Sequence, residues 1–224
     1  MDLKVKDIAN LLGVNESTIM ELIDKKKIPF YKIKNQYLFN KAEINEWILQ
    51  NKINVSDKIL DLKHTAKQVI ITQLIEKGGI HCKIKGKNVK EVLKNAVASI
   101  PVPPDMPHDM ILTCLLEREE MMSTAVGRGI ALPHSRNPII SDMESESISV
   151  CLLDKPVDFK ALDGKPVHTL FIIISSNPKR HLEILSKIAF LCQLDEFVMI
   201  LEDKAEEEAI LHYIEKIEKE WERR

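Results

Sequence analysis

Hydrophobic residues recur along this chain either at helical spacing or at every second position, as in a strand, and each change of spacing marks a boundary between predicted elements. Between Leu3 and Leu12 the apolar residues recur at helical spacing, and the pattern stops at Gly13. A second helical run follows. Asn15, directly before it, is a suitable N-cap because its side-chain oxygen can accept a backbone N–H of the first turn. These patterns predict two short helices joined by a tight turn.

Two short strands and a further helix are predicted next. Alternating apolar residues over 28–39 surround a polar tip at 34–36, which is typical of a β-hairpin. Asn40 and Glu43, three positions apart, form a capping-box signature that starts a third helix. All of these elements fit within residues 1–52, so we predict a small separate domain there.

The remaining chain predicts a linker and a larger domain. Residues 53–66 mix polar side chains with weak periodicity, so we assign them to a linker. In residues 67–224 helical and strand-like segments alternate, and the apolar run 169–174 favours a strand buried on both faces. The predicted helices lie near 69–76, 88–97, 110–120, 179–194 and 202–224, and the predicted strands near 80–84, 130–132, 147–153 and 169–174. An α/β domain whose mixed β-sheet is flanked by helices accommodates this alternation.

Composition narrows the classes of function. The 224 residues are 45% hydrophobic and 29% charged, which suits a soluble globular protein, and no apolar run reaches the roughly 18 residues of a membrane-spanning helix. The N-terminus has no apolar signal core, so we expect a cytoplasmic protein without membrane insertion. A net charge of -2 gives the whole chain no electrostatic preference for nucleic acid. The four cysteines lie far apart without Cys-x-x-Cys spacing, so we expect buried free thiols and neither a metal site nor a cofactor.

The strongest candidate for chemistry is His134, at the end of a short apolar stretch. Gly127 and Gly129 allow a close backbone approach or a positive φ, so N–H groups there could form an anion-binding concavity. Arg136 lies two residues beyond the histidine, and a guanidinium binds phosphate through two parallel hydrogen bonds. Further candidate donors are Ser123, Thr124 and Arg128. These features leave open both a phosphoryl-accepting imidazole and a histidine held by structural hydrogen bonds.

The order of motifs around this histidine resembles the fructose/mannitol-type (type 2) enzyme IIA domain of the bacterial phosphoenolpyruvate-dependent phosphotransferase system, a group that includes the nitrogen-regulatory IIA proteins. The resemblance extends from about Val69 to Tyr213. The matching motifs are Arg118-Glu119, Ser123-Thr124, the glycine-flanked run from Gly127 to His134 with Arg136 after it, the segment Val157 to Val167, and His181 heading a downstream helix.

The resemblance implies a role for each matching residue. His134 would accept a phosphoryl group from an HPr-type phosphocarrier protein, and Arg118 would neutralise the charge that moves with it. His181 would bond the phosphate or set the tautomer of His134, although a helix-capping histidine remains open as an alternative. The implied phosphate-binding residues are Ser123, Thr124, Gly127, Gly129 and Arg136. The resemblance implies no metal, and it implies an enzyme IIB or a regulatory protein as the acceptor.

Residues 1–52 carry a second resemblance, to the excisionase and MerR-type winged helix-turn-helix. It rests on the segment from Val5 to Ile19, on Ile28-Pro-Phe-Tyr-Lys32 and on the stretch from Phe39 to Trp47. In that family the second helix enters the major groove and the wing lies along the DNA backbone. Carried over, Ser17, Thr18 and Glu21 would face bases, and Lys32, Lys34 and Gln36 would meet phosphates or the minor groove.

The low net charge of this small domain argues against DNA binding but not against the helix-turn-helix fold. Residues 1–52 contain nine lysines and seven acidic residues, a net charge of +2, whereas phosphate contacts supply most of the affinity of DNA-binding domains. A protein-interaction or dimerisation element therefore stays open as an alternative to a DNA-binding one.

Three functions remain in view. The first is a regulatory, nitrogen-type phosphotransferase component that forms phosphohistidine, because the small domain is fused to it and no sugar-permease or IIB sequence is attached. The second is a transcription regulator whose DNA binding is controlled by the IIA-like domain. The third, a metal-dependent hydrolase using His134 and His181, lacks a carboxylate or cysteine partner with ligand-like spacing.

Overall fold

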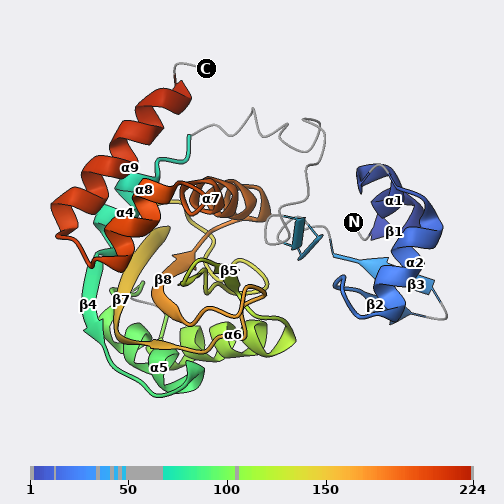
Figure 1. Ribbon diagram of the computed structural model, residues 1–224, viewed down its shortest axis with the longest axis horizontal. Helices are drawn as coiled ribbons and strands as arrows, with labels where there is room; N and C mark the ends of the chain where they lie inside the picture. The colour runs from blue at the N-terminus through green and yellow to red at the C-terminus, as the bar shows by residue number, and fades with distance from the viewer. Residues whose placement is uncertain are drawn as a thin grey trace. The chain divides into compact units, whose positions relative to one another are not determined.

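The computed structural model describes residues 3–12, 14–33, 36–40, 43–44, 47–48, 68–103 and 106–222. The chain divides into two compact units, Met1–Lys67 and Gln68–Arg224 (Figure 1). The predicted linker at 53–66 and Lys34 at the hairpin tip lie outside the described residues, whereas the two hairpin strands on either side of that tip are described.

The first unit combines two helices with a three-stranded antiparallel sheet. Its elements are α1 (Val5–Leu12), α2 (Glu16–Asp24), β1 (Leu3–Lys4), β2 (Tyr31–Ile33) and β3 (Gln36–Phe39), with the strand order β1-β3-β2. Residues 43–44 and 47–48 are helical, as the capping box at Asn40 predicts. The indole N–H of Trp47 donates to the carbonyl of Lys27 at 2.5 Å, and the fully buried residues of this unit include Ile8, Ile19 and Phe39.

Two local predictions for this unit were wrong. Asn15 has the extended backbone of an N-cap, but its side chain makes no capping hydrogen bond, and its backbone carbonyl accepts the N–H of Thr18 at 3.0 Å instead. Leu3 and Lys4 form a strand rather than the start of a helix because they pair with Phe39 and with the residue before it. Pairing with a distant strand outweighed the local helical pattern.

The second unit is built on a five-stranded mixed sheet with the order β4-β7-β8-β6-β5. The strands are β4 (Ile80–Ile84), β5 (Ala125–Gly127), β6 (Ile130–Ala131), β7 (Ser147–Val157) and β8 (Val167–Ile174). The pairs β4–β7 and β6–β8 are parallel, and the pairs β7–β8 and β5–β6 are antiparallel. The central strand β8 is buried along nearly its whole length, which explains its continuously apolar sequence.

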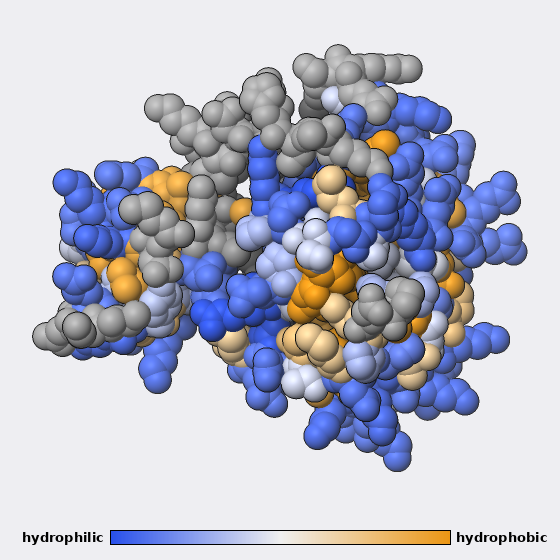
Figure 2. Space-filling view, turned by 180° about the vertical axis from the view of Figure 1, so that it is seen from behind, coloured by the Kyte–Doolittle hydropathy of each residue, from blue (hydrophilic) through white to orange (hydrophobic). Residues whose placement is uncertain are grey.

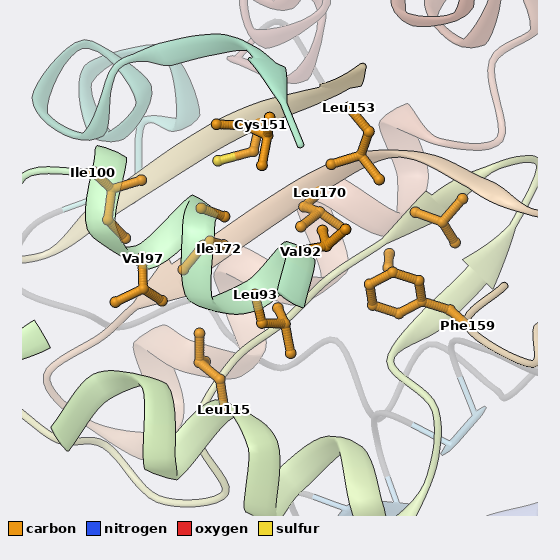
Figure 3. Packing of buried hydrophobic residues seen from close by; sticks show 14 of the residues in the cluster. Val92, Leu93, Val97, Ile100, Leu115, Cys151, Leu153, Phe159, Leu170 and Ile172 are labelled. Carbon is orange, nitrogen blue, oxygen red and sulfur yellow. The ribbon is translucent and has the colours of Figure 1, made fainter. Parts of the chain in front are cut away.

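Helices cover both faces of this sheet, which confirms the predicted fold class. They are α4 (Ile71–Gly78), α5 (Val89–Ser99), α6 (His108–Met121), α7 (Pro178–Leu191), α8 (Asp195–Glu202) and α9 (Glu207–Glu222). Figure 1 shows α5 and α6 on one side of the sheet and α4, α7, α8 and α9 on the other. The core under α5 and α6 includes Leu93, Leu115, Phe159 and Ile172 (Figure 3).

Details of the second unit differ from the sequence prediction. The hairpin strand β5 is additional, and the predicted helix over 179–194 ends at Leu191, with α8 as a separate helix after it. The expectation of four buried thiols was also wrong, because Cys82 is exposed and Cys114 is only partly buried. Hydrophilic residues dominate the face seen in Figure 2, and hydrophobic residues are visible in an area of the larger unit and in smaller areas of the first unit. Within the described ranges, no helix has the length and apolar composition needed to span a bilayer.

Candidate active site

His134 stands at the end of a parallel strand pair. Ile130 pairs with Thr169 in β6–β8, and the isolated bridge between His134 and Ile173 continues the same register four residues further on. The N–H of Ile173 donates to the carbonyl of Pro133 at 3.0 Å, which fixes the backbone directly before the histidine. The carboxyl ends of parallel strands form the edge where ligands commonly bind in α/β folds, so the fold presents His134 at a suitable position.

The ring of His134 is buried, with an exposed fraction of 2%. Its Nδ1 lies 2.6 Å from the backbone carbonyl oxygen of Leu132. A carbonyl oxygen only accepts hydrogen bonds, so Nδ1 carries the proton and, in the neutral ring, Nε2 carries the lone pair. The local backbone therefore selects Nε2 as the nucleophilic nitrogen.

His181, which comes later in the chain, lies next to His134. It lies in the first turn of α7, 5% exposed, and its ring centroid is 5.0 Å from that of His134 at an interplanar angle of 57°. The helix is capped by Asn177, whose side chain accepts the N–H of Arg180 at 3.0 Å. Nδ1 of His181 is 2.8 Å from the hydroxyl oxygen of Ser175. The structure thus brings together two histidines that the sequence separates by 47 positions.

The end of α6 is tied to the strand that carries His134. Arg118, in the last turn of α6, is 3% exposed and donates from Nη1 to the carbonyl of Met122 at 2.7 Å. The neighbouring Glu119 carboxylate accepts from the N–H and the hydroxyl of Thr124, at 3.0 and 2.5 Å. The carbonyl of Thr124 in turn accepts the N–H of Leu132 at 3.0 Å, two residues before the histidine.

Burial raises the pKa of Glu119 above the ordinary glutamate value. Hydrogen bonds from Thr124 and Ser123 and the positive charge of Arg118 act in the opposite direction, and burial outweighs them. Burying this carboxylate costs desolvation energy, and the hydrogen bonds from Thr124 hold it in place. Through Thr124, Glu119 links α6 to the strand that carries His134.

The two hydroxyls predicted to bind phosphate have other partners. The hydroxyl of Ser123 lies 2.5 Å from the carbonyl of Phe159 and also has the carboxylate of Glu119 as an acceptor, and the hydroxyl of Thr124 donates to Glu119. A hydroxyl has a single proton to donate, so in this conformation neither side chain has one to offer to a phosphate. Both residues shape the site by holding the backbone in place.

The turn that contains Gly127 and Gly129, the glycine turn, lies away from His134. Gly127 and Gly129 have φ values of +84° and +76°, as predicted, and the turn between them joins β5 to the start of β6. Five residues of strand from Gly129 to His134 span about 16 Å. The N–H of Arg128 donates to Asp163 at 2.7 Å, and a Cβ on Gly129 would meet the ring of His168 at 2.2 Å. The glycines permit close packing there and do not bring their N–H groups to His134.

The two remaining arginines of the motif diverge. Arg136 lies two residues after His134 and is exposed. Arg128 turns towards the connection between α7 and α8, where it forms an ion pair with Asp195 and donates to the carbonyl of Gln193 at 2.8 Å. Arg136 therefore remains a candidate for the phosphate, whereas Arg128 supports the fold.

Comparison with known proteins decides the family. Residues 73–217 match the family described as "Phosphoenolpyruvate-dependent sugar phosphotransferase system, EIIA 2". The chain belongs to this family. Residues 3–52 match a helix-turn-helix domain family, in agreement with the fold of the first unit.

The relatives of the EIIA domain include nitrogen regulatory proteins and components of sugar phosphotransferase systems. A nitrogen regulatory protein of Pseudomonas aeruginosa is 41% identical over 105 residues, 46% of this chain and 65% of that protein, so the match spans less than two thirds of the relative. A mannitol-specific phosphotransferase enzyme IIA component of Geobacillus stearothermophilus is 33% identical over 138 residues, 62% of this chain and 91% of that protein. The crystal structure of the nitrogen regulatory protein IIA-Ntr from Neisseria meningitidis aligns with a TM-score of 0.57 at 25% identity, covering 65% of this chain and 99% of that one.

The EIIA domain also contains a buried ion pair that sequence reasoning missed. Glu146, with 0% of its side chain exposed, lies 2.6 Å from Nε of Arg180, the residue before His181. The other carboxylate oxygen accepts the N–H and the hydroxyl of Ser176, at 2.9 and 2.6 Å. The only hint in the sequence was an arginine in the first turn of a predicted helix, where the helix dipole disfavours a cation. No group of three or more potential metal-ligating side chains occurs in the part of the chain that the structure describes.

The predicted DNA-contacting residues lie on the surface of the first unit. Ser17 and Thr18 are exposed in the first turn of α2, and Lys32 and Gln36 are exposed on the two hairpin strands. Glu21, predicted to face bases, forms an exposed ion pair with the next-turn lysine at 3.4 Å. These positions suit a groove-facing helix and a flanking hairpin, while the +2 charge of residues 1–52 remains low for a DNA-binding domain.

Proposed function

We propose that the chain is a phosphohistidine carrier. It accepts a phosphoryl group from an HPr-type phosphocarrier protein on Nε2 of His134 and passes it to a second protein, an enzyme IIB or a regulatory target. The observation that supports this most directly is the hydrogen bond from Nδ1 of His134 to the carbonyl of Leu132, within a buried pair of histidines in an EIIA domain.

The transfer needs no deprotonation of His134. The Nε2 lone pair attacks the phosphorus of the donor's phosphohistidine, a P–N bond forms, and the donor's P–N bond breaks with its electron pair returning to the donor imidazole. The proton on Nδ1 stays there, and the carbonyl of Leu132 stabilises the positive charge that develops on the ring. The reverse of this step delivers the phosphoryl group to the acceptor.

Three side chains are assigned to the charge of the phosphoryl group. Arg118 neutralises it from the end of α6, and His181 donates a hydrogen bond from the first turn of α7. Arg136, exposed two residues after His134, contributes the third group, a positively charged hydrogen-bond donor. Ser123, Thr124, Gly127 and Gly129 are not assigned to phosphate, because the contacts described above use them elsewhere.

Phosphorylation with purified components tests the proposal. Incubation with phosphoenolpyruvate, enzyme I and HPr is expected to place an acid-labile phosphoryl group on the wild-type protein and none on His134→Ala. The exposed His212 on α9 provides the matched control, and His212→Ala is expected to label like wild type. His181→Ala is expected to slow transfer by on the order of 100-fold, the usual cost of losing one hydrogen-bond donor to a developing charge. Equal labelling of His134→Ala and wild type would contradict the assignment.

A regulatory role is the second part of the proposal. Several relatives are named nitrogen regulatory proteins, and the first unit matches a helix-turn-helix family. Phosphorylation adds up to about two negative charges to the EIIA domain, which is enough to alter the affinity of a charged partner. We propose that this change is read out through the first unit, with DNA as the candidate partner.

DNA binding by the first unit has its own test. Binding to the promoter region of the protein's own gene is expected to weaken steeply as salt is raised, and to be lost when Lys32 and Lys34 are both replaced by alanine. A Ser17→Ala variant should instead change sequence preference with little effect on the salt dependence. Absence of binding at low salt would assign the first unit to protein interaction.

A further inference from the structure

The ion pair between Glu146 and Arg180 has no part in the transfer described above, yet it is sealed from solvent. The side chains are 0% and 5% exposed, and the two groups are 2.6 Å apart. Desolvating two charges is costly, and a buried pair frequently contributes less to stability than apolar residues of the same volume would. Its presence directly beside His181 points to a role other than stability.

The pair holds both ends of the segment that connects β8 to the first turn of α7. This turn segment runs from Ser175, directly after β8, to His181, and the hydroxyl oxygen of Ser175 lies 2.8 Å from Nδ1 of that histidine. One oxygen of Glu146 binds the N–H and the hydroxyl of Ser176, and the other binds Nε of Arg180. A single carboxylate thus fixes the residue that follows Ser175 and the residue that precedes His181.

We propose that Glu146 and Arg180 are positioning residues for the phosphoryl-transfer site. By fixing both ends of this turn, they keep the hydroxyl of Ser175 donating to Nδ1 of His181, so that Nε2 of His181 carries the proton and serves as the hydrogen-bond donor to the phosphoryl group. Arg180 has a second effect. It compensates the charge of Glu146, which unpaired would repel the phosphoryl group. The inference rests on the proposed function, since it concerns the geometry of the same site.

The test uses Glu146→Gln with Glu183→Gln as its matched control. Glu183 lies on α7, the helix whose first turn contains Arg180 and His181. It is also buried and pairs with a cation, Lys187 at 3.4 Å, but its carboxylate accepts the N–H of Val69, whereas that of Glu146 accepts from the segment before His181. Both variants remove a buried carboxylate charge from a paired lysine or arginine. They differ in whether the turn that carries His181 loses its anchor.

Two quantities are measured in the full chain. The first is the ¹⁵N chemical shifts of the His181 ring nitrogens in the unphosphorylated protein, which report the tautomer. The second is the rate of phosphoryl transfer from phosphorylated HPr. In Glu146→Gln we expect the ring nitrogens to lose the pattern of a single Nε2–H tautomer and transfer to slow by about 10- to 100-fold, the effect of a small misplacement of a reacting group. Glu183→Gln is expected to keep the wild-type shifts and a rate within about 3-fold of wild type.

A second variant covers the case in which Glu146→Gln fails to fold because the buried charge of Arg180 loses the carboxylate that balances it. The double variant Glu146→Met with Arg180→Met removes both charges and keeps the volume, so it is expected to stay folded. It is expected to show the same altered His181 shifts and the same slower transfer.

The outcomes separate this inference from the function on which it rests. If wild-type protein accepts no phosphoryl group, the proposed function fails, and the ¹⁵N shifts still decide whether the pair sets the tautomer of His181. If wild type is phosphorylated and the folded Glu146 variants keep both its shifts and its rate, the positioning role is wrong.

Discussion

At the scale of single residues, the tautomer of His134 follows from a hydrogen bond to a backbone carbonyl. The bond from Nδ1 to Leu132 is local, spanning two residues, so the strand conformation that creates the site also determines which nitrogen reacts. The second partner, His181, depends on Ser175 and on a carboxylate 35 positions earlier in the chain. One histidine is therefore set by its own strand, and the other by contacts distant in sequence.

The pKa of Glu119 leads to a prediction about pH. Burial raises this pKa in the folded state, so the fold favours the protonated carboxyl. The resulting contribution to stability is fully present below the ordinary glutamate pKa of about 4.3 and is lost as the pH rises through the folded-state value. Glu119→Gln lacks this titration. Relative to wild type, its free energy of unfolding is expected to increase as the pH is raised from about 4 to about 7, because wild type loses this contribution and the variant does not.

Urea unfolding of both proteins at several pH values in this range measures the difference. If the difference in free energy of unfolding between the two proteins does not change with pH, the fold does not shift the pKa of Glu119. The loss of the bond to Thr124 in the variant adds an offset that is the same at every pH, so the slope and not the offset carries the result.

At the scale of elements, the N-terminus of α4 is capped from α9. Ile70, at the N-cap position, has no side chain that can accept a hydrogen bond. The carboxylate of Glu218 accepts the N–H groups of Ile71 and Thr72 at 2.5 and 3.2 Å, and the hydroxyl of Thr72 at 2.6 Å. A carboxylate is well suited to the positive end of the helix dipole, so α9 completes a helix that its own sequence leaves uncapped.

Glu218→Gln is expected to lower the free energy of unfolding by about 1–3 kcal/mol, the usual loss for a charged hydrogen-bond acceptor with several donors. Glu215→Gln, on the same helix, is the control. Its exposed pair with Lys219 at 3.5 Å is expected to contribute less than about 1 kcal/mol. Denaturant unfolding followed by circular dichroism compares the two, and equal losses would show that Glu218 does not act as a cap.

At the scale of the whole molecule, the candidate site belongs to one unit. His134, His181, Arg118 and the pair of Glu146 with Arg180 all come from residues 68–224, as does the hydrophobic core beneath α5 and α6. The first unit has its own buried residues around Ile8 and Phe39. Each unit therefore contains the apolar contacts that an independent domain needs.

A fragment comprising residues 68–224 is expected to fold and to accept a phosphoryl group from HPr at a rate within about 3-fold of the full chain, because every group proposed for the transfer lies within it. The same phosphorylation assay, with circular dichroism as a check on folding, provides the measurement. A folded fragment that no longer labels would place part of the site in the first unit.

Much of this molecule could be predicted from its sequence. The α/β class, both domain families and the strand 169–174 follow from periodicity and from motifs with fixed spacing, which depend on local geometry. The order Arg118, His134, His181 resembles a known family closely enough to select the reacting histidine as a candidate. Less could be predicted about the supporting contacts. Ser123 and Thr124 were predicted to bind phosphate, and the sequence does not reveal that in this structure their hydroxyls meet the carbonyl of Phe159 and the carboxylate of Glu119.

The sequence by itself determined most of the secondary structure, the two families and the histidine that we propose to react, because these depend on residues close together along the chain or on an order of motifs that resembles a known family. Only the tertiary structure decided that the glycine turn lies at the far end of β6, that Glu218 caps α4, and that Glu146 holds the turn before His181. The physical reason is that a buried carboxylate must be paired, and its partners, here 30 and 34 positions away, become neighbours only when strands and helices pack.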